Sequence, residues 1–254
     1  MTQSAGLGII CALTSEAATL AQRVRPNRIH ALPGIGAMML AGMGEENAER
    51  AARQLLAAHP TCALISFGVA GALDPALQSG QLLCPQQVLD HQGRRFDTAL
   101  QQGLWYQSLP QAEQSALITG GTLLGVVDAV ASAAKKQQLH QQSGAQAVDM
   151  ESAAIARVAA EQQRPFMVLR AIIDAAQDDI PEKVINAVDQ YGRPGVRLAS
   201  LLLSPEQLLM LPRLARQSAL AHQQLHAIAA RLPALATLFR MAGKQPAEQA
   251  AQAR

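Results

Sequence analysis

The sequence predicts a three-layer α/β/α sandwich with a mixed, mainly parallel β-sheet, followed by a helical C-terminal extension. Continuous apolar runs, such as residues 7–13 and 62–69, are typical of strands that are buried on both faces. Segments with helical period separate these runs, and the connections between them are short. Alternation of this kind favours one sheet with helices packed on both of its faces.

The N-terminal quarter of the chain carries clear start and stop signals. Hydroxyl side chains that follow the first apolar run can cap a helix, a Pro-Gly pair marks a turn, and a Gly-Met-Gly segment opens a second helix. The expected elements are, in order, a strand at Leu7–Leu13, a helix from Thr14 and Ser15 to about Val24, a hairpin around Pro33 and Gly34, a helix at Glu45–Ala58 and a strand at Cys62–Val69.

The middle of the chain continues the alternation. A glycine-bearing loop from Gly68 to Gly80 follows the last of these strands, and a second loop, Gly120–Thr122, lies further on. The remaining expected elements are strands at Leu82–Leu89 and Ser115–Thr119, a helix at Ala131–Gln142, a strand at Ala145–Val148, a helix at Ser152–Gln163 and a strand at Phe166–Ile173.

Charge divides the chain into two parts. Up to residue 182 there are 12 Lys and Arg against 16 Asp and Glu, net −4, and from residue 183 there are 9 against 3, net +6. We therefore predict a catalytic domain at 1–193 and a basic, amphipathic helical extension at 194–254. The extension either packs its apolar stripe on the body or on a second subunit, or makes a peripheral contact with an anionic membrane.

Composition limits the class of protein. The net charge of +2 gives no sign of a nucleic-acid partner, and no uncharged apolar stretch reaches the length of about 18–20 residues that a membrane helix needs. The start MTQSAG lacks the features of a signal peptide, and the three cysteines stand alone within apolar runs. We expect a cytoplasmic protein, at most peripheral to the inner membrane surface, with buried cysteines and no metal.

Acidic side chains follow three of the expected strands. Glu16 comes after the first, Asp149 and Glu151 after the strand at 145–148, and Asp174 after the last. Because ligands bind at the carboxyl ends of the strands in an open α/β sheet, these acids predict a site at one edge. Each acid also has a simpler interpretation, since Asp and Glu in these positions can cap a helix or complement its dipole.

The acids suggest distinct chemistry. Asp174 follows so apolar a strand that its pKa should rise, which suits a general acid near neutral pH. A carboxylate such as Glu151 can bind the two hydroxyls of a ribose by charge-assisted hydrogen bonds. The segment Ser66–Pro75 has glycines that let the backbone approach a ligand, or that simply form a turn.

The order and spacing of these motifs closely resemble a known superfamily. The segments Ile65–Gly80 (ISFGVAGALDPALQSG), Ala147–Arg157 (AVDMESAAIAR) and Leu169–Asp174 (LRAIID) resemble three signature stretches of the purine nucleoside phosphorylases and methylthioadenosine/S-adenosylhomocysteine nucleosidases. The opening Gly8–Glu16 is similar to that of the nucleosidases. The resemblance, from about Leu7 to Asp178, implies the phosphorylase/hydrolase-like fold and cleavage of the N-glycosidic bond of a purine nucleoside.

The resemblance also implies roles for single residues. Asp174 resembles the acid that protonates N7 of the base, Glu16 the residue that orients the attacking water, Glu151 the ligand of the ribose hydroxyls, and Met150 the side chain that packs on the sugar. Further substrate contacts are expected at Asp149, Val69, Ala70, Gly71, Val127 and Asp128. The family resemblance implies a homo-oligomer and no cofactor.

The nucleophile stays open between water and phosphate. The expected phosphate or water site comprises Thr14, Ser15, Ser66 and Gly68. The related phosphorylases hold phosphate with arginines near the first strand and before the glycine loop, and this chain has none there. Amides and hydroxyls hold a dianion poorly without a cation, so phosphate is a candidate co-substrate and hydrolysis is at least as well supported.

The segments DMES and SFGVAGALDP most resemble the corresponding segments of the hopanoid-associated phosphorylases. This resemblance implies release of adenine from adenosylhopane, a lipid-linked nucleoside. One alternative is a methylthioadenosine/S-adenosylhomocysteine nucleosidase. Another is a nonenzymatic nucleoside- or lipid-binding protein on the same fold. A flavodoxin-like or dinucleotide-binding domain is disfavoured, because the third glycine of the dinucleotide fingerprint is missing.

Overall fold

The computed structural model describes residues 6–99, 101–195 and 210–242. Its strands lie between residues 7 and 174. They are β1 (Leu7–Cys11), β2 (Ile29–Leu32), β3 (Gly36–Leu40), β4 (Ala63–Ala72), β5 (Leu82–Cys84), β6 (Gln87–Leu89), β7 (Arg95–Asp97), β8 (Leu117–Thr119), β9 (Thr122–Gly125), β10 (Ala147–Asp149) and β11 (Phe166–Asp174).

Helices alternate with these strands and continue beyond them. They are α1 (Thr14–Ala18), α2 (Glu45–Ala58), α3 (Gln101–Ser108), α4 (Gln111–Ala116), α5 (Ala133–Ser143), α6 (Ser152–Glu161), α7 (Glu182–Ile185), α9 (Leu211–Ala229) and α10 (Leu232–Ala242). Within the described ranges, no helix combines the length and the apolar character that crossing a membrane requires.

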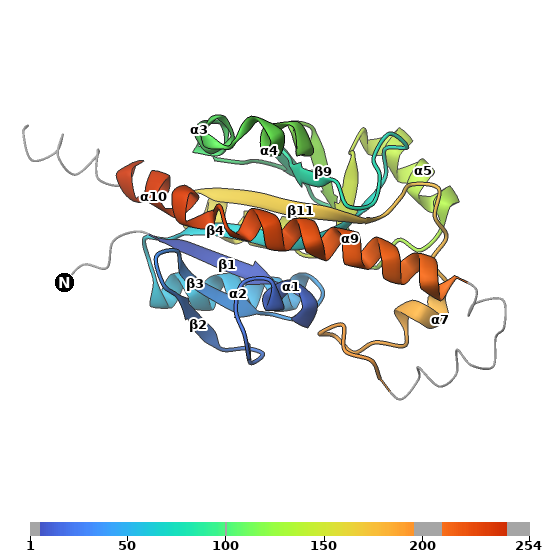
Figure 1. The fold of residues 1–254 in the computed structure, drawn as a ribbon, viewed down its shortest axis with the longest axis horizontal. Coiled ribbons are helices and arrows are strands. Elements are labelled where there is room, and N and C mark those ends of the chain that lie inside the picture. The colour runs from blue at the N-terminus through green and yellow to red at the C-terminus, as the bar shows by residue number, and fades with distance from the viewer. Residues whose placement is uncertain (1–5, 100, 196–209, 243–254) are drawn as a thin grey trace, which may run out of the picture.

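The strands form one mixed sheet in which parallel pairs outnumber antiparallel ones. Its main path is β2-β3-β1-β4-β10-β9-β6-β7, and β11 pairs with β4 and with β5, which in turn pairs with β8. The strand β4 is central because β1 and β11 both run parallel to it. The carboxyl ends of β1, β4 and β11 therefore meet at one edge, on the side where α5 and α7 lie (Figure 1).

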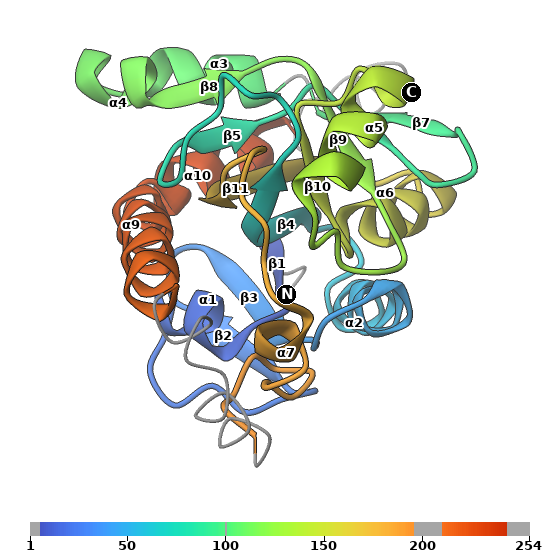
Figure 2. The same cartoon turned by 90° about the vertical axis from the view of Figure 1, so that its right-hand side faces the viewer.

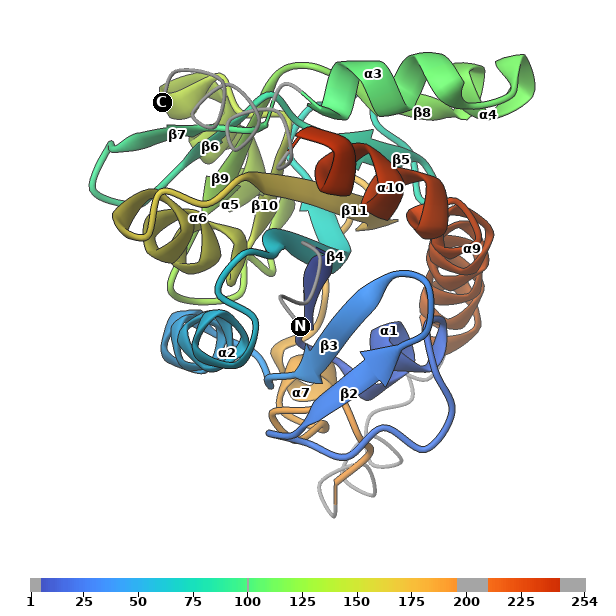
Figure 3. The same cartoon turned by 90° about the vertical axis from the view of Figure 1, so that its left-hand side faces the viewer.

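Helices cover both faces of the sheet (Figure 2 and Figure 3). The helices α2 and α6 share a buried apolar cluster with Ile10 and Leu64, whereas α9 and α10 share another with Ile9 and Ile65. Neighbouring residues of one strand thus enter opposite layers, which is why the strands read as unbroken apolar runs. The predicted three-layer α/β/α sandwich is confirmed.

The C-terminal helices belong to the core. In α9 and α10, the large apolar side chains that are buried against the body are Leu225, Ile228, Leu232, Leu235 and Phe239. The described helices therefore pack an apolar stripe on the body, as the first of the two expectations for the extension states. Residues 196–209 and 243–254 of the extension lie outside the described residues, and the domain boundary at 193 stays a prediction.

Several predicted boundaries are wrong. Thr14 and Ser15 lie inside α1 rather than capping it, and the helix ends at Ala18 instead of near Val24. The expected strand at 82–89 is divided into β5 and β6 around Pro85, which has no amide hydrogen to donate. The short elements α3, β7 and β9 were not predicted.

The most consequential difference concerns the glycine loop. The sequence predicts a loop from Gly68, but β4 continues to Ala72 and pairs with β11 as far as Gly71, with a shift in register between Ile172 and Asp174. Gly68 pairs with Arg170 in this register. A Cβ on Gly68 would collide with the side chains of Glu16 and Arg170, so the glycine makes room for two charged groups beside the sheet.

Candidate active site

A cavity of about 280 Å³ opens at the carboxyl ends of the strands, on the edge that faces the viewer in Figure 2. The last residues of β4 and the segments that follow β1, β3, β9, β10 and β11 contribute to its wall. The predicted site residues that line it are Glu16, Val69, Ala70, Gly71, Asp149, Met150, Glu151 and Asp174. The structure therefore brings together the acids that the sequence placed after three separate strands.

A buried guanidinium organises most of these acids. The side chain of Arg170 comes from the middle of β11, and the residue is 1% exposed. Its Nη2 lies 2.6 Å from Asp149 Oδ2 and 3.4 Å from Glu151 Oε2, and its Nη1 lies 3.9 Å from Glu16 Oε1. Nη2 also donates to the hydroxyl of Ser66 at 2.8 Å. One cation is thus shared by three carboxylates.

Glu16 is held from several sides. Its Oε2 accepts hydrogen bonds from the amides of Ala12 and Leu13, both at 2.9 Å, and its Oε1 accepts one from the amide of Val69 at 2.8 Å. Burial raises the pKa of Glu16, whereas Arg170 and the three amides lower it. A carboxylate that is fixed in this way has a defined position at the cavity wall and can accept a proton.

Asp149 and Glu151 make different contacts at the start of α6. Asp149 contacts the first residue of α6 from the end of β10: its Oδ1 accepts from the amide of Ser152 at 3.1 Å, and its Oδ2 contacts the hydroxyl of that residue. Glu151 reaches across to Gly44, whose amide donates to Oε1 at 2.9 Å. Burial, only partly offset by Arg170, raises the pKa of Glu151 to about 7.

Asp174 has a separate cationic partner. The ammonium of Lys136, on α5, contacts Asp174 Oδ2, and both side chains are buried. Burial raises the pKa of Asp174, in agreement with the sequence-based argument, while Lys136 opposes the rise. Sequence reasoning gave neither Arg170 nor Lys136 a role. A charged residue within an apolar strand was a usable signal for Arg170, because a buried charge needs partners.

Several predicted site residues lie away from the cavity wall. Val127 and Asp128 are exposed, and Val126, Ala129 and Val130 line the cavity in their place. The prediction thus names the right loop, but the residues on either side of Val127 and Asp128 are the ones that face the cavity.

The four residues that were expected to form a phosphate or water site do not line the cavity. Ser15 is exposed on α1, and Ser66 and Gly68 lie within β4, behind the cavity wall. The hydroxyl of Thr14 accepts a hydrogen bond from Nε of Arg193 at 3.2 Å. The amide of Val69, which could have served an anion, donates to Glu16.

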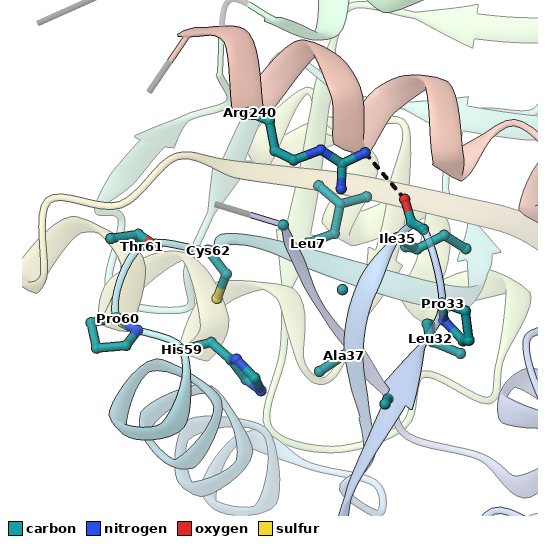
Figure 4. A pocket seen from close by; sticks show the side chains of 14 residues that line it. Leu7, Leu32, Pro33, Ile35, Ala37, His59, Pro60, Thr61, Cys62 and Arg240 are labelled. Atoms are coloured by element: carbon teal, nitrogen blue, oxygen red, sulfur yellow. Dashed lines mark hydrogen bonds between the residues drawn. The ribbon is translucent and has the colours of Figure 1, made fainter. Parts of the chain in front are cut away.

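A larger cavity, of about 650 Å³, lies at the opposite edge of the sheet (Figure 4). Leu7, Pro33 and Pro60 are among its lining residues, and the guanidinium of Arg240 donates to the carbonyl of Gly34 at 3.2 Å. No acidic residue is among the described residues that line it. Within the described chain, no cluster of three His, Cys, Asp or Glu side chains has the arrangement of a metal site either.

Comparison with known proteins agrees with this geometry. The model of the phosphorylase superfamily matches residues 7–203. A curated relative is the 5′-methylthioadenosine/S-adenosylhomocysteine nucleosidase of Staphylococcus epidermidis, which is 28% identical over 183 residues, 64% of this chain and 78% of the relative.

Solved structures share the fold. The 5′-methylthioadenosine/S-adenosylhomocysteine nucleosidase of Helicobacter pylori, with butyl-thio-DADMe-Immucillin-A, has a TM-score of 0.66 at 17% identity, covering 91% of this chain and 97% of that one. The futalosine hydrolase of the same organism has a TM-score of 0.64 at 18% identity, covering 91% and 97%. The match of the family model over most of the chain, on this fold, shows that the protein is an enzyme of the phosphorylase superfamily.

Proposed function

We propose that the protein hydrolyses the N-glycosidic bond of an adenine nucleoside. The observation that carries the proposal is the convergence of Glu16, Glu151 and Asp174 on one cavity. Asp174 donates a proton to N7 of the base, the C1′–N9 bond breaks, and its electron pair goes to the purine. Water then bonds to C1′ and gives a proton to Glu16, so that free adenine and the sugar are released.

The ribose is assigned to Glu151 and Met150. Glu151 is buried in the cavity wall and accepts hydrogen bonds, and a carboxylate of this kind fits the 2′ and 3′ hydroxyls. Protonation of the leaving base by a positioned acid typically contributes about 10²–10⁴-fold in rate. No cofactor is needed for this chemistry, which requires only an acid, a base and water.

Electrostatics support water rather than phosphate as the nucleophile. Arg170 is already surrounded by Glu16, Asp149 and Glu151, so a phosphate dianion at this place would meet three carboxyl groups and one guanidinium. Among the described residues, the other arginine that contacts α1 is Arg193, which is exposed and donates to the hydroxyl of Thr14. Phosphorolysis would have to depend on such a cation or on a second subunit.

The deciding experiment measures free adenine after incubation with adenosine. We expect release in phosphate-free buffer, and less than about tenfold stimulation by millimolar phosphate. Strict dependence on phosphate would refute hydrolysis, and an Arg193→Gln variant would then show whether that arginine holds the anion. Binding without any release of adenine from the nucleosides tested would instead favour the nonenzymatic alternative.

For the finer specificity we propose an apolar 5′ substituent. The segment after β11 places Ile180, Ile185 and Val188 in the cavity wall. The cavity, about 280 Å³, is at the small end of ligand sites, which typically measure about 300–1,000 Å³. A polycyclic arm, as in adenosylhopane, would therefore extend past these residues into solvent or a bilayer. Methylthioadenosine, on which the staphylococcal relative is named to act, is the alternative.

Competition between substrates separates the two. A catalytic efficiency that is higher for an adenosyl-lipid than for methylthioadenosine, and that falls in an Ile185→Asp variant, supports the lipid-linked substrate. The reverse preference refutes it. In the described helices of the extension, a membrane contact would involve exposed basic residues such as Arg213 and Arg216, because the apolar side chains of Leu225, Ile228, Leu232, Leu235 and Phe239 are buried. We also propose a homo-oligomer, which light scattering can test.

A further inference from the structure

The helix α5 carries two adjacent lysines in opposite environments. Lys135 is exposed, and its ammonium donates to Gln138 at 3.3 Å. Lys136 has no exposed surface, and its ammonium donates to the carbonyls of Ala175 at 3.0 Å and Asp178 at 2.9 Å as well as to Asp174 Oδ2. All three hydrogens of a buried ammonium are thus used, and one of them is given to the proposed acid.

The contact leaves the two oxygens of Asp174 with different surroundings. Oδ2 is occupied by Lys136, whereas among the described residues no hydrogen bond involves Oδ1. Asp174 lines the cavity, where the backbone of Gly71 lies next to the carboxyl group. Oδ1 is therefore the oxygen that is available to carry a proton and to meet a ligand.

We propose that Lys136 is a positioning residue for glycosidic cleavage: it fixes Oδ2 of Asp174 so that Oδ1 donates the proton to the leaving base, and it stabilises the carboxylate that remains. The inference rests on the proposed function and names a residue through which that function is tuned. The proton moves from Oδ1 to N7 of the purine, while Lys136 keeps its own three hydrogens.

The charges around the pair determine the pH dependence. Asp178 adjoins it from the segment after β11, and Arg213 of α9 lies 3.3 Å from the Asp178 carboxylate. Glu16 of α1 and the acids at the end of β10, Asp149 and Glu151, line the same cavity. Arg170 of β11 contacts all three. Burial and Asp178 raise the pKa of Asp174, and Lys136 is the group that lowers it.

The sign of the expected effect follows from this balance. A general acid works when protonated, so kcat/KM falls on the alkaline side as pH passes the pKa of Asp174. Removing the ammonium takes away the group that lowers this pKa, so the alkaline limb must move to higher pH. At the same time the maximal rate must fall, because the departing proton leaves behind a buried carboxylate without its partner.

The test compares Lys136→Met with the matched control Lys135→Met, using adenosine over a range of pH. For Lys136→Met we expect kcat to fall about 10–100-fold, KM to change by less than about threefold, and the alkaline limb to move up by about one pH unit or more. Lys135→Met should behave as the wild type. With a 4-nitrophenyl riboside, whose leaving group needs no proton, Lys136→Met should lose less than about threefold.

A loss that is the same at every pH and the same for both substrates would overturn the proposal and make Lys136 a purely structural residue. If Lys136→Met does not fold, Lys136→Gln must still move the alkaline limb and Lys136→Arg must leave it in place. Adenine release by the wild type separates the two levels of inference. If the wild type cleaves nucleosides but the alkaline limb of the pH profile stays in place in the variants, only the role of Lys136 is refuted. If the wild type is inactive, the proposed function and the role of Lys136 are both refuted.

Discussion

Replacing Glu151 by Gln tests the ribose site with little change in shape. The amide of Gly44 donates to Glu151 Oε1 at 2.9 Å, and the carbonyl oxygen of a glutamine can accept the same bond. The change therefore removes the charge and preserves the link between Gly44 and the start of α6. Because the side chain is buried, a loss of charge there acts on a bound hydroxyl with little screening by solvent.

The size of the effect follows from the strength of a charged hydrogen bond. A hydrogen bond to a charged group contributes about 1.5–3 kcal/mol and a neutral one about 0.5–1.5 kcal/mol, so the preference for ribose over 2′-deoxyribose should fall about 5–13-fold in the variant. The wild-type preference should also depend on pH. With the pKa of Glu151 raised to about 7, the charged fraction rises from about 10% at pH 6 to about 90% at pH 8.

The assay is the ratio of kcat/KM for adenosine to that for 2′-deoxyadenosine between pH 6 and pH 8. Ionisation of Asp174 affects both substrates alike and cancels in this ratio. The intrinsic reactivity of the two sugars is the same with both enzymes and cancels when the ratios of wild type and variant are compared. Glu161→Gln, at the exposed end of the same helix, is the control. A ratio that is flat with pH in the wild type, or unchanged in Glu151→Gln, would refute a role in sugar binding and leave Glu151 as a tie between Gly44 and α6.

Three further changes test other parts of the site and the fold. Asp174→Asn should bind adenosine but lose at least about 10²-fold in turnover, and a rate within a few fold of the wild type would remove Asp174 from the mechanism. Gly68→Ala should push the carboxylate of Glu16 from its place, which lowers kcat at least about tenfold and the free energy of unfolding by about 1–3 kcal/mol. The control is Gly103→Ala, whose added Cβ meets no atom, and it should lower neither quantity. Equal thermal midpoints for the two variants would contradict this. A chain that ends at Gly195 loses five large buried side chains, each of which stabilises the fold by about 1.5–3 kcal/mol, so we expect an insoluble protein. A folded, active fragment would show that the extension is dispensable.

The sequence predicts the architecture well where burial alone decides it. The apolar runs at 7–13, 62–69 and 166–173 become β1, β4 and β11, and the expected helix at 45–58 is α2 residue for residue. Prediction fails where tertiary contacts override local signals. Gly68 and Gly71 look like a loop, yet β11 pairs with β4 throughout this segment and keeps it extended.

The acids of the site follow from sequence, but their partners do not. Glu16 follows β1 and Asp174 ends β11, and the parallel pairing of both strands with β4 brings these two acids to one edge. Glu151 follows β10, which runs antiparallel to β4 but pairs with its last residues, at the same edge. Lys136 lies on a polar helix beside the exposed Lys135, and nothing in that pattern distinguishes the buried lysine from its neighbour. Its burial depends on the path of residues 175–178, which sequence patterns do not predict.

The two cations divide the carboxyl groups of the cavity into two sets with different chemistry. Arg170 shares its charge among Glu16, Asp149 and Glu151, so none of the three has a full counter-charge. Asp174 has the ammonium of Lys136 to itself. An acid and a base can act in one cavity at one pH only if their environments separate their proton affinities. Burial raises the pKa of both Glu16 and Asp174, but the cation that opposes the rise is Arg170 for Glu16 and Lys136 for Asp174, so a change at either cation acts on one of the two groups first.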